Sequence, residues 1–534
     1  MVRRSRRRLQ RSPAQRQPLD RVAIVVIAGL ALAIGLLVFS GDHAIARVRE
    51  FTWQDRQVGA EDRAFVITFS RPMDSVSVEE NLTIDPPLPG RVSWAGRRMA
   101  YTFDHPIPYG QSFKVSLQDA RDRFSADLEQ PISRFAPFEA NFQTRDRAFL
   151  YIGVEGDEAN RLVLADLQRQ ERTILTPRHL SVIHFIPYPL GDKVLFSASD
   201  TSNGGGLLSQ KLYTVTTGIH PHPPDDLMTG GPSLWERLWS RPSVAAESGE
   251  LELVLDDKDY QNLKFDLSPD GQTIVVQRVN QQNPADFGPW VIRQGQAPRP
   301  LDTDPGGDFL IAPDSQSLVL LQGEGTAIID LEQQTQTGPS QPLDFLPDYG
   351  RVFDLAPDGS AAAMVNYNQN DPERRFMESL FLVTNVGQEE ELLQVSGAIL
   401  DAQFDSAKQF LYVLASEVTV DTDNRDAIAS ESYTEQPMLL AINLEAMAMT
   451  KLLLLPQQQR IHMSLAPDGL SLLLDLDGQV HADTLEPSES ENGDRASIWH
   501  IPLFTDSEER DTSTPTVIDP EPFPFHGLQA SWLP

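Results

Sequence analysis

The sequence predicts an all-β protein: a single membrane-spanning helix, then a small β-sandwich, then a β-propeller of about seven four-stranded blades. Three observations lead to this expectation. One uninterrupted apolar segment lies near the N-terminus, short strand-like segments follow it at intervals of about ten residues, and a short turn phrase then recurs, with three of its copies 44 residues apart. A chain of 534 residues is also too long for one compact domain, so several units are expected.

The apolar segment, Val22–Phe39, contains no charged or polar side chain and no proline. A helix of this length measures about 27 Å, close to the hydrocarbon thickness of a bilayer. Eight arginines and one acid precede it, so the positive-inside rule places the N-terminus in the cytoplasm. We therefore expect a basic cytoplasmic tail over 1–21, a transmembrane helix over 22–40 and a stalk over 41–56, in a single-pass protein of the cytoplasmic membrane with most of its chain extracytoplasmic. A signal peptide cleaved at Ala44–Ala46 is the alternative.

The charge is distributed unevenly along the chain. Residues 1–21 carry +7, and since the whole chain carries −32, the remaining 513 residues carry −39. A body this acidic argues against nucleic acid as a partner, because phosphate contacts need clustered lysine and arginine. The absence of cysteine excludes disulfide scaffolds, thiol catalysis and cysteine-ligated metals.

Residues 57–146 have the pattern of a β-sandwich. Short runs of β-forming residues are separated by Pro-Pro, Pro-Gly and Ala-Gly turns, as in all-β sandwiches of this size. The expected strands are Arg63–Met73, Asn81–Asp85, Arg91–Trp94, Met99–Phe103, Ser112–Leu117 and Phe138–Gln143.

Several spaced motifs of this unit resemble a known family. The string FSRPMD at Phe69–Asp74, the segment Leu82–Ile84, the string GRVSW at Gly90–Trp94 and the run Tyr101–Asp122 are similar to the bacterial SbsA-type Ig-like domain. The resemblance implies an Ig-like spacer of the kind found in surface and envelope proteins, without an active site of its own.

Residues 147–534 repeat a phrase in which a serine or alanine, a proline, an aspartate and a glycine or serine separate two apolar strands. Proline presets φ, aspartate bonds nearby amides and glycine accepts a positive φ, so the phrase predicts a tight turn between the first two strands of a blade. Its copies are Ser268–Gly271, Ala312–Ser315, Ala356–Gly359 and Ala466–Gly469. We count seven blades, with six or eight left open, from the expected second strands Leu150–Val154, Lys193–Ala198, Thr273–Arg278, Ser317–Gln322, Ala361–Asn366, Gln409–Ala415 and Leu470–Leu476.

Gly527–Pro534 resembles an inner strand with nothing after it, so we expect it to complete the first blade and close the ring. The repeats themselves resemble the TolB/WD40-like propeller family, whose repeats carry the same phrase. This resemblance implies the fold and leaves the ligand open.

An insertion at 219–249 interrupts the period and carries the candidate docking surface, Leu234, Trp235, Leu238 and Trp239. At helical spacing these side chains form one apolar face. This face could bind a partner, or it could pack against the propeller itself as a lid. His220 and His222 lie nearby, but their spacing beside prolines matches no metal site. We expect no metal and no cofactor.

No sequence motif of a known catalytic site is present, so the sequence favours a protein that is not an enzyme. The expected function is that of a membrane-tethered extracytoplasmic scaffold, in which the Ig-like spacer presents a propeller that binds an envelope protein, a peptide or a glycan. The alternative is an enzyme or small-ligand-binding protein that uses the propeller channel, and it requires carboxylates, histidine or arginine to converge at the channel mouth.

Overall fold

The computed structural model describes residues 26–32, 34, 45–59, 62–123, 135–203, 209–219, 247–304, 306–323, 325–332, 344–346, 349–420, 433–458, 460–476, 496–504 and 514–534. Within these residues the fold is all-β and made largely of four-stranded sheets, as expected. No helix in the same ranges is long and apolar enough to cross a membrane. Most of the span expected at 22–40 lies outside the described residues; those described, 26–32 and 34, are helical and exposed.

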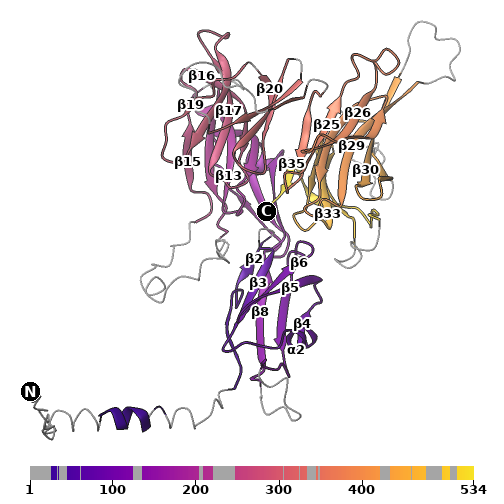
Figure 1. Ribbon diagram of the computed structural model, residues 1–534. Coiled ribbons are helices and arrows are strands. Elements are labelled where there is room, and N and C mark those ends of the chain that lie inside the picture. Colours follow the sequence, from indigo (N-terminus) through magenta and orange to yellow (C-terminus); the bar gives the residue numbers. More distant parts are fainter. Residues whose placement is uncertain are drawn as a thin grey trace, which may run out of the picture.

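Two four-stranded sheets pack face to face below the propeller (Figure 1). The first has the order β1-β3-β6-β5 and the second the order β2-β8-β7-β4. Their bounds are β1 Val48–Phe51, β2 Gln57–Val58, β3 Ala64–Phe69, β4 Leu82–Asp85, β5 Gly90–Ala95, β6 Arg98–Phe103, β7 Ser112–Leu117 and β8 Phe138–Thr144. The strands expected from the sequence are confirmed as β3 to β8, and the pairing of β1 and β2 completes the two sheets.

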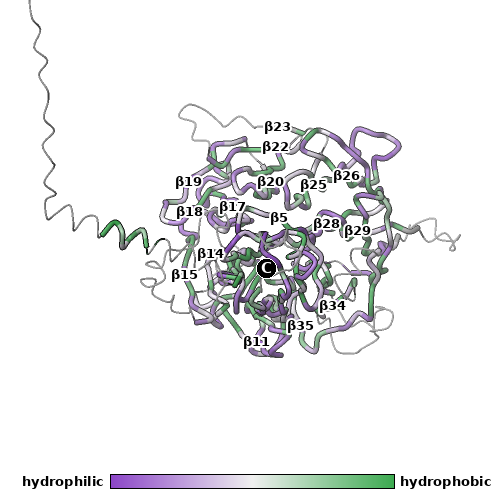
Figure 2. The backbone as a smooth tube through the Cα atoms, turned by 60° about the horizontal axis from the view of Figure 1, so that its bottom comes forward, coloured by the Kyte–Doolittle hydropathy of each residue, from purple (hydrophilic) through white to green (hydrophobic). Residues whose placement is uncertain are grey.

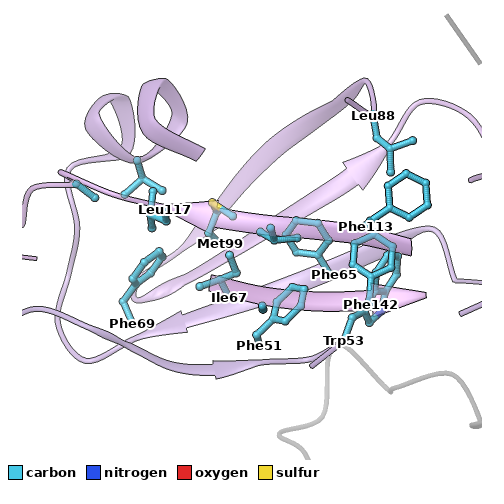
Figure 3. Close-up of a cluster of buried hydrophobic side chains, with 14 of the residues drawn as sticks. Phe51, Trp53, Phe65, Ile67, Phe69, Leu88, Met99, Phe113, Leu117 and Phe142 are labelled. Carbon is cyan, nitrogen blue, oxygen red and sulfur yellow. The ribbon is translucent and has the colours of Figure 1, made fainter. Parts of the chain in front are cut away.

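Aromatic side chains fill the space between these two sheets (Figure 3). Trp53 is 1% exposed, stacks on Phe103 at 5.4 Å between ring centroids, and meets Phe142 edge-on at 5.0 Å. The sequence pattern missed helix α2 (Ser75–Asn81), which follows the strand-breaking Pro72. Val78 of α2 is fully buried in the same core, so burial of this side chain stabilises a helix too short to be stable alone.

The rest of the chain forms sheets arranged around the C-terminus in a roughly circular outline (Figure 2). Five have four strands in chain order, β12–β15, β16–β19, β20–β23, β24–β27 and β28–β31. Their bounds are β12 Leu180–Pro187, β13 Lys193–Asp200, β14 Gln210–Thr216, β15 Leu251–Leu255, β16 Tyr260–Leu267, β17 Thr273–Asn280, β18 Phe287–Arg293, β19 Arg299–Pro300, β20 Gly306–Ile311, β21 Ser317–Gln322, β22 Gly325–Asp330, β23 Asp344–Leu346, β24 Val352–Leu355, β25 Ala361–Asn366, β26 Glu378–Thr384, β27 Glu389–Val395, β28 Ile399–Phe404, β29 Phe410–Val420, β30 Tyr433–Asn443 and β31 Ala448–Leu454.

The chain's last strand, β35 (Glu521–Trp532), belongs to two blades at once. Its first half pairs with β34 (Ser497–Pro502), where His526 lies opposite Ser497, and its second half pairs with β9 (Ala148–Gly153), where Gly527 lies opposite Gly153. The resulting sheet of seven strands also contains β10 (Leu162–Asp166), β11 (Glu171–Ile174), β32 (Ile461–Leu465) and β33 (Ser471–Leu476). The expected pairing of the C-terminal segment with the first blade is therefore confirmed.

The repeated phrase forms the tight turn that the sequence predicts. In each copy the amide of its fourth residue donates to the carbonyl of its first, for example Gly271 to Ser268 at 2.7 Å and Ser315 to Ala312 at 2.9 Å. The fourth residue has a positive φ, 70° at Gly271 and 59° at Ser315. These turns join the first two strands of their blades, so all of them lie at one end of the propeller, the end that faces the sandwich.

The insertion expected at 219–249 lies between β14 and β15, the third and fourth strands of the second blade. The candidate docking residues Leu234, Trp235, Leu238 and Trp239, and the pair His220 and His222, lie outside the described residues.

The sandwich and the propeller are joined by buried contacts. The Tyr109 amide donates to a carboxylate oxygen of Asp468 at 3.2 Å, and Nη1 of Arg145 donates to the carbonyl of Pro534 at 2.9 Å. Asp468 and Arg145 are 3% and 6% exposed. These contacts hold the linker between the two parts, Thr144–Asp146, against both of them.

Candidate functional site

The inner strands of the blades line the propeller channel, and alternate residues of a strand point to the same side. Several of these strands carry a pair of polar residues two positions apart in an otherwise apolar sequence. The pairs are Lys264 and Asp266, Asp401 and Gln403, His462 and Ser464, and Gln529 and Ser531. They form two layers, one nearer the phrase turns and one nearer the face away from the sandwich.

The layer nearer the turns connects the blades to one another. Asp266 accepts a hydrogen bond at 2.7 Å from the Ile311 amide of the next inner strand, and Asp354 accepts one at 2.8 Å from the Phe404 amide. Gln403 accepts one at 3.0 Å from the Leu465 amide. Burial raises the pKa of Asp354 to about 7, although amide donors oppose the shift. This layer satisfies backbone groups between neighbouring blades, and its main role is structural.

The second layer draws one polar side chain from each of the seven blades. We call it the channel ring, and its members are Lys264, Asp308, Arg351, Asp401, His462, Gln529 and His184. Six lie on inner strands, and Arg351 directly precedes β24. Neighbouring members interact, for example Gln529 and His184, whose Oε1 and Nδ1 atoms are 3.0 Å apart.

One side of the channel ring is cationic. Asp308 pairs with Lys264 on one side and with Nε of Arg351 at 3.3 Å on the other, so two cations share one carboxylate. Lys264 also lies over the ring of Phe309, and Arg351 over the ring of Phe353 at 4.6 Å. Cation–π contacts of this kind hold charged side chains in place beside a channel.

Acidic groups follow in the sixth and seventh blades, and Asp401 lies near enough to Arg351 of the fifth blade to interact with it electrostatically. Asp401 accepts hydrogen bonds from the Ala402 amide at 2.9 Å and from Nε2 of Gln403 at 3.0 Å. Asp475, on β33 behind the ring, accepts hydrogen bonds from the backbone amides of His462 and Gln529. Burial raises the pKa of both carboxyls, and the nearby His462 opposes the shift. Enclosed carboxyls with raised pKa beside a histidine are typical of binding and catalytic sites.

A cleft of about 540 Å³ opens beside the acidic side of the ring. It lies between the sixth, seventh and first blades, and its walls include Leu400, Arg460, His462, Asp475 and Gln529. The Nδ1 atom of His462 is buried with no hydrogen-bond partner among the described residues. A cleft of this volume with a few convergent polar groups fits a small ligand.

No group of histidine, aspartate and glutamate in the described ranges has the arrangement of a metal site. The channel ring was missed in the sequence, although a signal was present. Lys264, Asp308, Asp401 and His462 each stand a few positions before a phrase turn or its degenerate copy, where an apolar residue is expected. An alignment of the repeats on their turns would have shown a polar residue recurring at this position in four of them.

Comparisons with known proteins give similarity of fold alone. No protein-family model matches the chain, and no curated protein matches it. Among solved structures, an oligogalacturonate lyase in complex with manganese is 12% identical, with a TM-score of 0.40 over 63% of this chain and 82% of that one. TolB from Acinetobacter baumannii is 12% identical, with a TM-score of 0.36 over 70% and 79% of the two chains. A putative 6-phosphogluconolactonase from Bacteroides uniformis is 11% identical, with a TM-score of 0.39 over 72% and 99%.

These structures correct one expectation from the sequence. The absence of a catalytic motif favoured a protein that is not an enzyme, but structures titled as a lyase and a putative lactonase are among those similar to this chain. Motif searches fail on such folds because a propeller channel draws its polar residues from strands far apart in the sequence. At this level of identity the similarity assigns no reaction to the chain.

Proposed function

We propose that this protein is a membrane-tethered extracytoplasmic binding protein whose propeller binds a polar ligand or partner segment at the channel ring. The observation that carries the proposal is the convergence of one polar side chain from each blade, beside a cleft of about 540 Å³. Residues 22–534 carry a net charge of −39, so the two cations of the ring, Lys264 and Arg351, stand out as positive groups in an acidic chain.

The orientation of the site supports a role away from the membrane. The phrase turns face the sandwich, and the channel ring lies farther from those turns than the layer of Asp266 and Asp354. With the apolar segment 22–40 as the anchor, the sandwich serves as an Ig-like spacer and the ring faces away from the bilayer. The contacts of Tyr109 and Arg145 with the propeller keep this direction fixed.

Photo-crosslinking in cells tests where binding occurs. A benzophenone amino acid replaces Leu400, which lines the cleft and is 37% exposed, in the full-length protein. The matched control replaces Leu253, which is 52% exposed on the outer strand β15. We expect a reproducible adduct at position 400 and none at 253. Absence of an adduct at 400, or equal labelling at both positions, would contradict a binding site at the cleft.

Membrane fractionation tests the tether independently. The full-length protein is expected in the membrane pellet after a high-salt wash, and a variant lacking residues 1–40 in the supernatant. Recovery of both forms in the supernatant would refute tethering by residues 22–40 while leaving the binding site untouched.

Catalysis in the same channel is a second candidate, favoured by the raised pKa of Asp401 and Asp475 beside His462. A carboxyl whose pKa is raised by burial keeps its proton to higher pH than usual and is a potential general acid. Turnover of oligosaccharides or peptides by the purified protein, lost in Asp401→Asn, would support it. Turnover that persists in this variant would exclude Asp401 as the acid.

A further inference from the structure

The end of the propeller away from the sandwich carries a loop with an exposed aromatic side chain. The phrase turn Ala356–Gly359 joins β24 to β25, so the loop from β25 to β26 lies at the opposite end of the blade. Phe376 of this loop is 86% exposed, and Met377 beside it is 37% exposed. Removing such an apolar surface from water is favourable, so an exposed aromatic residue on a firmly held loop is typical of a contact with a partner.

Hydrogen bonds hold the loop on both sides of Phe376. Before it, Nη1 of Arg374 donates to both carboxylate oxygens of Glu391, at 3.2 and 3.0 Å. After it, Nδ2 of the buried Asn368 donates to the Met377 carbonyl at 2.9 Å. Because the loop is fixed before it binds, a partner that contacts Phe376 loses little of its affinity to ordering the loop.

The exposed apolar surface continues onto the sixth blade. Glu378, next to Met377, accepts a hydrogen bond at 2.7 Å from the Ile399 amide, which places the start of β26 beside the start of β28. The register of β28 and β29 shifts directly after Ile399, so Leu400 is an extra residue in the ladder. A bulge of this kind re-aims a side chain, and Leu400 is exposed whereas Ile399 is buried. We call Phe376, Met377 and Leu400 the apolar strip.

The cleft of about 540 Å³ adjoins the apolar strip at Leu400. Three more apolar residues line the cleft, Pro437, Ile461 and Leu528, together with a few polar ones. A cavity of this composition can accept one side chain of a partner. A polypeptide can fill the cleft with one side chain and cover the strip with others, whereas a small ligand in the cleft leaves Phe376 exposed.

The charge of the chain decides between a second copy of it and a different protein. In the loop and the cleft, the exposed charged residues without an ion pair among the described ranges are Glu373 and Arg375, and Glu435 and Arg460, so their charges cancel. Residues 22–534 carry a net charge of −39. Two copies therefore repel each other, and a segment rich in lysine and arginine is attracted.

We propose that this end of the propeller binds a basic polypeptide segment of another protein, with one apolar side chain in the cleft and others on the apolar strip. The inference rests on the proposed binding function and specifies its partner. Apolar contact with Phe376 and Leu400 supplies the affinity, and the opposite charges of the two proteins raise the rate of association.

Selection from a phage library of random peptides of about twelve residues tests the proposal. The target is the full-length protein in lipid nanodiscs, and peptides that bind empty nanodiscs are removed first. We expect the enriched peptides to combine apolar residues with a net positive charge. In fluorescence polarisation, the best peptide should bind at least about tenfold more tightly than a version with glutamate in place of lysine and arginine, or one with serine in place of its apolar residues.

Variants of the protein locate the contact. Phe376→Ser and Leu400→Ser should each weaken binding of the best peptide about tenfold. Val386→Ser is the matched control, because Val386 is 76% exposed on the same blade but lies in the turn from β26 to β27, at the end that faces the sandwich. Circular dichroism checks the fold of each variant, and if Leu400→Ser is unfolded, the largely exposed Phe376 decides alone.

The proposal is overturned if no peptide is enriched over empty nanodiscs, if the acidic version binds as tightly, or if Val386→Ser weakens binding as much as the strip variants do. Crosslinking at position 400 separates this failure from failure of the proposed function. An adduct with a glycan or a small molecule removes only the inference about the partner. Absence of any adduct, together with absence of peptide binding, removes the binding site itself.

Discussion

Replacing Asp468 by alanine tests whether the sandwich and the propeller form one rigid unit. Asp468 is the aspartate of the last phrase turn, and it is the member of the set that reaches the sandwich. Its Oδ1 accepts the Leu470 amide at 3.1 Å within the turn, and its Oδ2 accepts the Tyr109 amide at 3.2 Å. Arg147 lies 3.8 Å from the same carboxylate.

The expected cost follows from these contacts. A hydrogen bond from an amide to a buried carboxylate contributes about 1.5–3 kcal/mol, since its loss leaves a desolvated donor. The Arg147 pair is partly exposed and adds less than about 1 kcal/mol. The Leu470 bond belongs to the turn alone, so a matched variant must account for it.

Asp314→Ala is that control. Asp314 occupies the same position in another phrase turn, is exposed, and bonds only within its turn among the described residues, to the Gln316 and Ser317 amides and to the Ser317 hydroxyl. Asp468→Ala is therefore expected to destabilise the protein by about 2 kcal/mol more than Asp314→Ala.

Hydrogen exchange at Tyr109 provides the local assay. A loss of about 2 kcal/mol corresponds to exchange about thirtyfold faster at this amide in Asp468→Ala, with no change in Asp314→Ala. Thermal unfolding of both variants gives the global comparison. Equal melting temperatures together with unchanged exchange at Tyr109 would refute the view that this contact fixes the propeller on the sandwich.

Two further predictions concern the propeller itself. Burial raises the pKa of Asp354 to about 7, so below that pH the folded state binds a proton that the unfolded chain releases above about pH 4. The free energy of unfolding should therefore fall by up to about 4 kcal/mol as the pH rises toward 7, and should level off above it. The drop in melting temperature from pH 5 to pH 8 should be smaller in Asp354→Asn than in the wild type. An equal drop in both proteins would contradict the assignment of this pH dependence to Asp354. Gly527→Ala should cost about 1–3 kcal/mol, since its Cβ would lie 2.3 Å from Cδ2 of Tyr151 where β35 meets β9. Gly288→Ala on β18, with nothing within 4 Å, should be nearly neutral in the same denaturation assay, and an equal loss in both variants would argue against close packing at β35.

Local features of the sequence predicted most of the strands. The expected second strands coincide with β9, β13, β17, β21, β25, β29 and β33, and the bounds of β21 and β25 agree to the residue. The same reasoning missed α2, because seven residues are too few to show a helical periodicity, although Asp74 at the N-cap position is a residue type that often begins a helix. The insertion at 219–249 was located by its interruption of the period, and it lies between β14 and β15.

The candidate site was far less predictable. The sequence pointed to Leu234, Trp235, Leu238 and Trp239 because they stand together in the chain, and they lie outside the described residues. The channel ring was found only in three dimensions, where Lys264 meets Asp308 across 44 positions and Gln529 meets His184 across 345.

By itself, the sequence determined the all-β class, the turns and the pairing of the C-terminal segment with the first blade. Turn geometry and strand alternation depend on residues within a few positions of each other, so they can be recognised in the sequence. The tertiary structure alone decided which polar side chains face the channel and which of them pair between neighbouring blades. Those relations arise when strands of different blades are brought side by side, and no local pattern records the partner of Asp308 or of Asp468.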